Sequence, residues 1–203
     1  MAKNIVLFSD GTGNSSGKLF RTNVWRLYQA LDLTHPADAQ AAAGETPQIA
    51  YYDDGVGTSS FKPIAILGGV FGVGLKRNVL DLYVFLCRNY EPGDRIYAFG
   101  FSRGAFTIRM LIGLVVTEGI LGCTTEESLR RHAVDAYRSY RVCYNPHGWL
   151  VRPVRALRDA AVRIWRRRRG QPLYEEIEKQ PVESVEFVGV GTRSRPTACR
   201  SPR

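Results

Sequence analysis

Four short runs of apolar and β-branched residues alternate along the chain with stretches of helical periodicity, and this alternation constrains the fold more than any other feature. The runs are Ile5–Ser9, Gln48–Tyr52, Arg95–Phe99 and Glu183–Val190. Short apolar runs that stop at glycine-containing loops are typical of buried parallel strands. Because helical stretches separate the runs, the sequence predicts an α/β fold with a doubly wound, mainly parallel sheet. A chain of 203 residues suits one domain.

Apolar residues at helical spacing predict the helices between the strands. The first helix is expected to start at Thr22 or Asn23, either of which can cap it, and another is expected to start at Thr125. The remaining predicted helices span Asn78–Arg88, Arg103–Thr117 and Pro153–Arg168. The segment Phe61–Gly74 is apolar and glycine-rich. It fits either a lid over an acyl-binding pocket or a buried glycine-rich helix.

A serine lies between two glycines where the third predicted strand passes into a helix, in Gly100-Phe101-Ser102-Arg103-Gly104. Gly-x-Ser-x-Gly at such a junction is typical of the nucleophile elbow of α/β-hydrolases, a strained turn that lifts the serine Oγ above the sheet. The five-residue pattern alone is common, but the flanking strand and helix make it specific. The sequence therefore predicts Ser102 as a nucleophile. The alternative is a glycine-lined strand exit with a solvated serine.

An elbow of this kind needs backbone N–H donors for the oxyanion that forms during acyl transfer. The N–H of Arg103, which follows the serine, is the first predicted donor. The second is expected from Gly11 or Thr12 in the loop after the first strand. The other interpretation of this loop is a tight turn tied down by Asp10 or Asn14. A phosphate-binding loop is disfavoured, because no Lys-Ser/Thr pair follows and no GxGxxG is present.

Three separated motifs resemble a known family. "LFSDGTGNS" (7–15), "YYDDGVGT" (51–58) and "YAFGFSRGAFTIRML" (97–111) are similar to the uncharacterised α/β-hydrolase domain family that includes the catalytic domains of type VI secretion phospholipase effectors. The resemblance implies a serine hydrolase that attacks ester bonds, with phospholipids as the substrate of some relatives. It places Ser102 at the nucleophile and Asp10, Asp53 and Asp54 at motif positions near the site.

The catalytic base and acid of a serine hydrolase have no match in this chain. The fold orders its triad as serine, acid, histidine, but His35 precedes the serine, His132 lies on a predicted helix stripe, and His147 lies in a turn before the last strand. The family's acid is expected in a Val-Trp-Asp-Thr-Val segment, where this chain has Val190 followed by Gly-Thr-Arg-Ser. We therefore expect an impaired or inactive hydrolase. The alternative is a non-catalytic partner-binding or lipid-binding module on a degenerate hydrolase fold.

Deletion of one base from codons for Trp-Asp-Thr-Val would produce Gly-Thr-Arg-Ser, which leads to a hypothesis about the end of the chain. Residues 1–190 would form the N-terminal portion of a hydrolase domain whose sheet is incomplete at its C-terminus. Residues 191–203 would be a disordered, out-of-frame tail. Resequencing of the gene tests this hypothesis, because it fails if no shifted frame encodes Trp-Asp-Thr after codon 190.

Positive charge is concentrated in the last quarter of the chain. Residues 1–149 contain 15 Lys/Arg and 13 Asp/Glu, whereas residues 150–203 contain 13 and 6. The segment Arg152–Arg169 combines arginines with apolar residues such as Trp165, which is typical of a helix on an anionic membrane surface. The alternative is a solvated helix whose apolar side covers the sheet. Nucleic acid is not an expected partner, because no recognisable binding module accompanies the arginines.

Composition excludes several other classes of protein. No secretory signal and no membrane-spanning stretch is recognisable, so a cytoplasmic protein is expected, with delivery as a secreted effector left open. The four cysteines have no zinc-ligand spacing. No metal or cofactor is therefore expected, and the cysteines are interpreted as free thiols.

Overall fold

A four-stranded parallel sheet forms the centre of the protein. The computed structural model describes residues 2–11, 22–33, 46–55, 70–123, 125–143, 152–170 and 172–191. Within this part the strand order is β2-β1-β3-β6, and every neighbouring pair is parallel. The strands are β1 (Asn4–Ser9), β2 (Gln48–Asp53), β3 (Arg95–Phe101) and β6 (Val185–Gly191). The predicted α/β class is confirmed.

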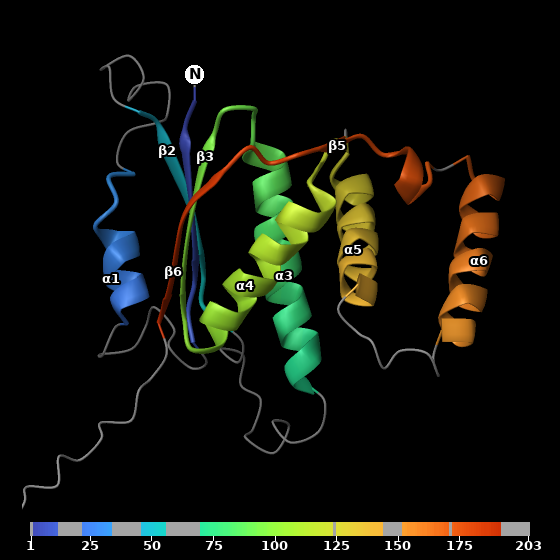
Figure 1. The fold of residues 1–203 in the computed structure, drawn as a ribbon, viewed down its shortest axis with the longest axis horizontal. Helices are drawn as coiled ribbons and strands as arrows, with labels where there is room; N and C mark the ends of the chain where they lie inside the picture. The colour runs from blue at the N-terminus through green and yellow to red at the C-terminus, as the bar shows by residue number, and fades with distance from the viewer. Residues whose placement is uncertain are drawn as a thin grey trace, which may run out of the picture.

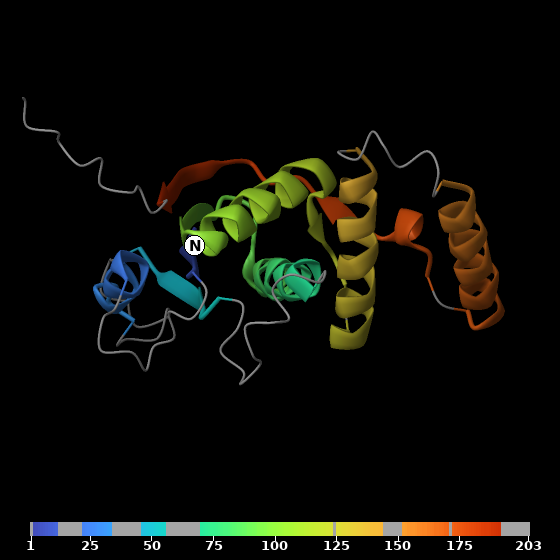
Figure 2. The same ribbon diagram turned by 90° about the horizontal axis from the view of Figure 1, so that it is seen from below.

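Helices cover both faces of this sheet, which makes it doubly wound. Figures 1 and 2 show α1 on one face, α3 and α4 on the other, and α5 and α6 farther out in succession. The helices are α1 (Asn23–Gln29), α3 (Val70–Asn89), α4 (Arg103–Glu118), α5 (Glu126–Cys143), α6 (Arg152–Arg168) and the short 3-10 helix η3 (Tyr174–Glu176). A two-residue antiparallel pair, β4 (Ile120–Leu121) with β5 (Lys179–Gln180), joins η3 to the end of α4.

The first strand is apolar at successive positions because it is buried on both faces. Ile5 and Leu7 belong to the large core formed with α3, α4 and α5. Val6 and Phe8 belong to a smaller core with Val24 of α1. Since successive side chains of a strand point to opposite faces, a strand between two helical layers has no polar face.

Two helix starts agree with the capping residues expected from the sequence. The side chain of Thr22 accepts a hydrogen bond from the Trp25 N–H at 3.1 Å and caps α1. At the start of α5, the Thr125 Oγ1 accepts from the Ser128 N–H at 3.3 Å. Each bond satisfies a backbone donor that has no partner inside its helix.

One helix is longer than the sequence predicts. α3 begins at Val70 rather than at Asn78 and continues through Gly72 and Gly74. Each interior glycine costs about 1 kcal/mol relative to alanine, but α3 packs against α4, α5 and the sheet, and this burial stabilises it. The segment Phe61–Gly74, interpreted as a lid or a buried helix, is described only from Val70 onward, where it forms the start of α3. Residues 61–69 lie outside the described residues.

The apolar side of α6 does not cover the sheet, which contradicts one of the two interpretations of this helix. Leu157, Ile164 and Trp165 are exposed, whereas Val162 and Arg166 are half-buried on the inner side toward α5. Figure 2 shows α6 outside α5, separated from the sheet by the intervening helices. With the sheet out of reach, the helix turns charged residues inward and leaves apolar ones in solvent.

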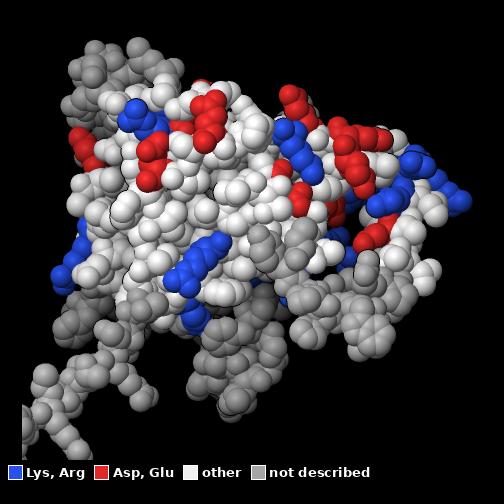
Figure 3. All heavy atoms as spheres, in the orientation of Figure 1, with Lys and Arg blue, Asp and Glu red and all other residues white. Residues whose placement is uncertain are grey.

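The sheet also leaves apolar side chains exposed along β6. Phe187, Val188 and Val190 are all exposed on this strand, which pairs only with β3 among the described strands. Figure 3 shows few charged side chains on this part of the surface. An exposed apolar edge strand is consistent with the predicted incomplete sheet, which stays a prediction.

Several sequence-based expectations lie outside the described residues. These are the positions of Thr12, His35 and His147 and the disorder of the tail from residue 192 onward. Gly191, assigned to the tail by the sequence analysis, is instead the last residue of β6. In the described part of the chain, no helix is long and apolar enough to cross a bilayer.

Candidate active site

Ser102 occupies the turn between β3 and α4 in a backbone conformation that serine rarely adopts. Its φ of 55° and ψ of −114° make it the single non-glycine residue with positive φ in the described chain. Such a conformation costs about 1–3 kcal/mol and persists only where the surrounding structure enforces it. The side chain is exposed and makes no hydrogen bond that caps α4. The hydroxyl is therefore presented to solvent at the carboxyl end of the sheet.

The glycines on either side of Ser102 are required by close backbone contacts. A Cβ atom on Gly104 would overlap the carbonyl oxygen of Ser9, and one on Gly100 would lie 2.6 Å from the carbonyl oxygen of Gly104. The first turn of α4 thus presses directly against the end of β1. This explains why glycine flanks the serine at both motif positions.

β6 also holds the turn in place. The Ser102 N–H donates to the carbonyl oxygen of Gly191 at 2.8 Å, and Phe101 pairs with Gly191 in the sheet. The serine is therefore fixed by hydrogen bonding to the strand on one side and by backbone packing against β1 on the other.

Asp10, at the end of β1, is buried and forms part of the framework of the site. Its Oδ2 accepts hydrogen bonds from the hydroxyls of Thr22 and Tyr52, the latter at 2.8 Å, and its Oδ1 accepts from the Gly11 N–H at 2.6 Å. Burial raises the pKa of Tyr52 above its ordinary value, and the bond to Asp10 raises it further. Asp10 joins β1, β2 and α1, which agrees with the interpretation of this loop as a turn tied down by its aspartate.

Asp53, at the end of β2, forms a second polar connection. Its Oδ2 accepts from the Ser9 hydroxyl at 2.8 Å and from the Asn78 side-chain amide at 2.6 Å. Burial raises the pKa of this carboxyl above its ordinary value, although both hydrogen bonds act in the opposite direction. Asn78 comes from α3, so Asp53 connects that helix to the sheet. No sequence motif marked Asn78, whereas Tyr52 lies within the "YYDDGVGT" motif.

The third predicted carboxylate lies beside Asp53, where the chain turns back toward β1. The Oδ1 of Asp54 is buried without a hydrogen-bond partner. Gly55, which follows it, has φ of 79° and leaves no room for a Cβ next to the carbonyl oxygen of Asp10. The loops after β1 and β2 are therefore in direct contact.

The sequence predicts backbone N–H donors for an oxyanion at Arg103 and Gly11, and the structure describes both residues. Arg103 is the first residue of α4 and follows Ser102, as the elbow requires. The Gly11 N–H donates a hydrogen bond to the carboxylate of Asp10 in this conformation. An oxyanion role for either residue stays a prediction.

His132, the one histidine among the described residues, is surrounded by parts of the molecule other than the Ser102 turn. It is buried on α5, its Nδ1 lies 3.8 Å from Asp135 Oδ2, and its ring stacks on Tyr174. Burial lowers the pKa of His132, and Arg166 lowers it further. Its Nδ1 has no hydrogen-bond partner. These contacts fit the expected core position on the helix stripe rather than that of a catalytic base.

Two further site expectations concern metals and thiols. No group of His, Cys, Asp and Glu suited to a metal ion occurs in the described ranges. Cys87 and Cys123 are free thiols, and burial raises the pKa of Cys87 to about 12. The Cys87 thiol is therefore in its unreactive, protonated form at neutral pH.

A parallel sheet with helices on both faces and a strained serine between the third strand and its helix has the architecture of α/β-hydrolases. The chain matches the family model described as "T6SS, Phospholipase effector Tle1-like, catalytic domain" over residues 3–190. It therefore belongs to this family, and the resemblance seen in the sequence motifs is confirmed.

The chain is also similar to a yeast protein. The chain is 34% identical over 141 residues to "Uncharacterized protein YEL023C" of Saccharomyces cerevisiae. The aligned region covers 63% of this chain and 19% of the relative. The chain thus spans about a fifth of the length of that protein. No solved structure gives a significant match.

Proposed function

We propose that this chain is the catalytic part of a serine hydrolase that cleaves ester bonds of phospholipids, with Ser102 as the nucleophile. The observation that supports the role of Ser102 is its exposed hydroxyl in a strained turn enforced by two glycines, in a chain of a phospholipase effector family. Strain of this kind is retained where a function requires it.

In the proposed reaction, the Ser102 Oγ attacks the ester carbonyl carbon and loses its proton to a base. The tetrahedral oxyanion is stabilised by backbone N–H groups, for which Arg103 and the loop at Gly11 and Thr12 are the candidates. Collapse releases the alcohol and leaves an acyl-serine ester, which water then hydrolyses. Without its base, such an enzyme keeps a rate enhancement of only about 10³–10⁴ over water. We expect low activity here, because His132 is held on α5 by other contacts.

An activity-based probe tests the role of Ser102. A fluorophosphonate should label the wild-type chain slowly and should not label Ser102→Ala. Ser184→Ala is the matched control, because Ser184 is also exposed but lies at the opposite end of β6; it should label like the wild type. Equal labelling of Ser102→Ala and wild type would place the nucleophile elsewhere.

A non-catalytic lipid-binding or partner-binding module is the second candidate function. The position of His132 favours it, since the described residues place no imidazole beside the serine. Complete absence of probe labelling in the wild type, together with retained binding to lipid vesicles, would support this candidate over the hydrolase.

For α6 we propose peripheral contact with an anionic membrane. Leu157 is 74% exposed, Ile164 56% and Trp165 47%, and the guanidinium of Arg169 lies 4.2 Å from the centre of the Trp165 ring. Apolar side chains next to arginines suit the boundary between lipid head groups and acyl chains. The exposed apolar side chains support this proposal, because the sheet does not bury them.

Vesicle sedimentation tests the membrane contact. Replacement of Ile164 and Trp165 by serine should weaken sedimentation with vesicles containing phosphatidylserine by about tenfold or more, since two apolar side chains leave the lipid. The control is Val116→Ser on α4, which is 70% exposed but lies on a different helix. Sedimentation that is unchanged in the double variant, or equally reduced in the control, would exclude α6 as the contact.

A further inference from the structure

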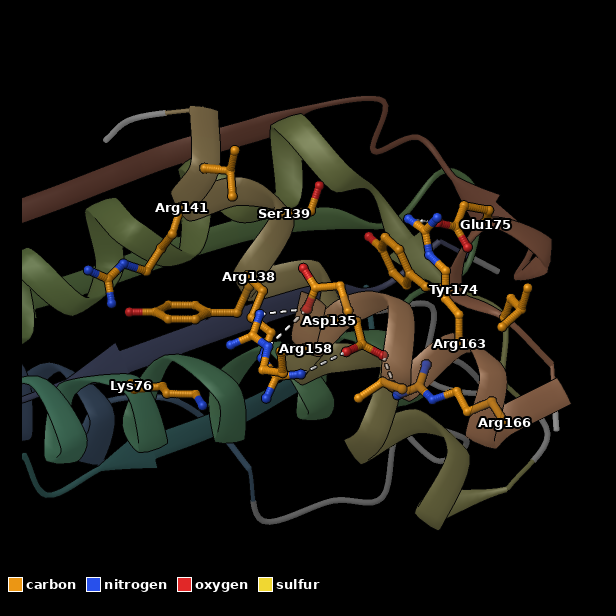
Figure 4. A pocket seen from close by; sticks show the side chains of 15 residues that line it. Lys76, Asp135, Arg138, Ser139, Arg141, Arg158, Arg163, Arg166, Tyr174 and Glu175 are labelled. Atoms are coloured by element: carbon orange, nitrogen blue, oxygen red, sulfur yellow. Dashed lines mark hydrogen bonds and ion pairs between the residues drawn. The ribbon is translucent and has the colours of Figure 1, made fainter. Parts of the chain in front are cut away.

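A cavity of about 490 Å³ lies between α5 and α6, away from Ser102 and its carboxylates. Lys76 of α3 and residues 173–175 complete its lining. Ligand sites commonly have volumes of about 300–1,000 Å³. Figure 4 shows side chains of α3, α5, α6 and η3 around this space. None of the residues assigned above to the Ser102 site lines it.

Positive charge is in excess around this cavity. Three of its lining residues are carboxylates: Asp135, Asp159 and Glu175. Six are cationic: Lys76, Arg138, Arg141, Arg158, Arg163 and Arg166. The lining therefore carries three uncompensated positive charges.

Each carboxylate of the cavity already has an arginine partner. Asp135 pairs with Arg138 at 3.2 Å and with Arg166 at 2.7 Å. Asp159 pairs with Arg158 at 2.7 Å, and Glu175 pairs with Arg163 at 3.2 Å. Four of the six cations are therefore paired, and no lining carboxylate is left for the other two.

Those two cations are Lys76 and Arg141, for which no described carboxylate lies within ion-pair distance. Arg141 packs over the Tyr137 ring at 5.9 Å, whereas Lys76 is half-buried among Arg138, Arg141 and Arg158. Burial lowers the pKa of Lys76, and the three guanidinium groups lower it further. A half-buried ammonium group among like charges is unfavourable unless an anion accompanies it.

We propose that the cavity between α5 and α6 binds a phosphate-bearing anion, with Lys76, Arg138 and Arg141 as its main ligands. Guanidinium groups match phosphate oxygens in a bidentate arrangement, and an ammonium group adds a compact charge. An excess of three charges suits a phosphate dianion better than a single carboxylate. The volume leaves room for the group esterified to the phosphate.

The phosphate could belong to a lipid head group or to a soluble ester, and both present the same chemistry to these side chains. The cavity lies against the side of α6 that faces α5, whereas the proposed membrane contact uses the opposite, exposed side of α6. The two sides therefore have separate tests. The site also does not depend on hydrolysis at Ser102, so Ser102→Ala should bind as the wild type does.

Isothermal titration with glycerol 3-phosphate measures the soluble source, and sedimentation with phosphatidic acid vesicles measures the lipid source. The test variant is K76Q/R141Q, which leaves no carboxylate without its partner. The matched control is R167Q/R168Q, which removes the same charge from exposed positions that do not line the cavity. We expect K76Q/R141Q to weaken binding of at least one probe by about tenfold or more, as loss of two charge-assisted contacts predicts. The control should change glycerol 3-phosphate binding less than about twofold.

The outcomes separate the sources and can overturn the site. Loss of glycerol 3-phosphate binding in K76Q/R141Q alone supports a soluble ester. Loss confined to phosphatidic acid vesicles, with phosphatidylserine vesicles of equal charge unaffected, supports a lipid head group. Equal losses of glycerol 3-phosphate binding in both variants, or no saturable binding of either probe to the wild type, overturn the proposal. If K76Q/R141Q fails to fold, R141Q alone gives the same test, because Arg141 is exposed.

Discussion

α4 and α6 are helices of nearly equal length that meet their surroundings in opposite ways. α4 is packed between the sheet and the outer helices and buries the side chains of Ala105, Ile108, Leu111, Leu114 and Val115. On α6, no side chain described between residues 156 and 168 is fully buried. The two helices therefore differ in what holds them and in what they expose. The inner helix is held by apolar packing and positions Ser102, whereas the outer helix presents charge to a cavity and apolar residues to solvent.

Substitution of matched isoleucines should give the largest difference between the two helices. Ile108 of α4 is fully buried, whereas Ile164 of α6 is 56% exposed. Ile108→Ala should lower the free energy of unfolding by about 3–4 kcal/mol, because it removes buried methyl groups and leaves a cavity. Ile164→Ala should change it by less than about 0.5 kcal/mol. Urea denaturation of both variants measures this difference. Similar losses would mean that α6 is packed like α4.

Matched glycines give a smaller contrast. Gly104→Ala should lower the free energy of unfolding by about 2–3 kcal/mol, because the added Cβ meets the backbone of Ser9. The control is Gly170→Ala after α6, where φ is 60° and the Cβ would meet nothing within 4 Å. It should cost about 1 kcal/mol, from the left-handed backbone alone.

Gly104→Ala should also reduce fluorophosphonate labelling of Ser102, since the turn that presents the hydroxyl depends on the close contact with β1. Gly170→Ala should leave labelling unchanged. If Gly104→Ala kept both its stability and its labelling, the strained turn would not depend on backbone packing.

The smallest expected effects concern pH, and they have opposite signs at Asp53 of β2 and Glu118 of α4. Burial raises the pKa of Asp53 at the sheet, so the folded state favours its protonated form. Its contribution to stability is present below the unfolded pKa near 3.8 and is lost as pH rises through the folded pKa. Asp53→Asn should therefore become more stable relative to wild type as pH rises from 4 to 7.

Glu118, at the outer end of α4, should behave in the opposite way. Burial raises its pKa, but hydrogen bonds from Ser139, Tyr174 and Lys179 together bring it below the ordinary value. The stability that it contributes is present above the unfolded pKa near 4.5 and is lost as pH falls through the folded pKa. Glu118→Gln should thus show its largest deficit at neutral pH. Denaturation midpoints between pH 3 and 7 measure both slopes, and slopes of the same sign would contradict the assignment.

Much of the sheet could be predicted because its strands carry a local signal. β1 and β3 are apolar runs that stop at glycines, and the residues that cap α1 and α5 are next to the helices they start. The two-residue strands β4 and β5 were not predicted, because a pair so short has no periodicity of its own. The start of α3 at Val70 was left open between a lid and a buried helix, since Gly72 and Gly74 give a weak helical signal.

The serine of the candidate site could be predicted from the sequence, whereas the residues that hydrogen-bond around it could not. Ser102 and its glycines form a contiguous motif, whereas Asn78, Thr22 and Gly191 reach the site from three different elements. A hydrogen bond between residues far apart in the chain leaves no local pattern. The same reason explains why the cationic cavity was not expected from the run of arginines alone.

The amino-acid sequence by itself determined the α/β alternation, the family and the position of the serine, because strand periodicity and the Gly-x-Ser-x-Gly motif are short-range properties. Only the tertiary structure decided that Asp10 and Asp53 connect β1 and β2 to α1 and α3, and that α6 turns charged residues toward α5. These contacts join residues far apart in the chain, and they depend on which helix surfaces stay uncovered once the helices have packed on the sheet. Both are properties of the whole folded chain.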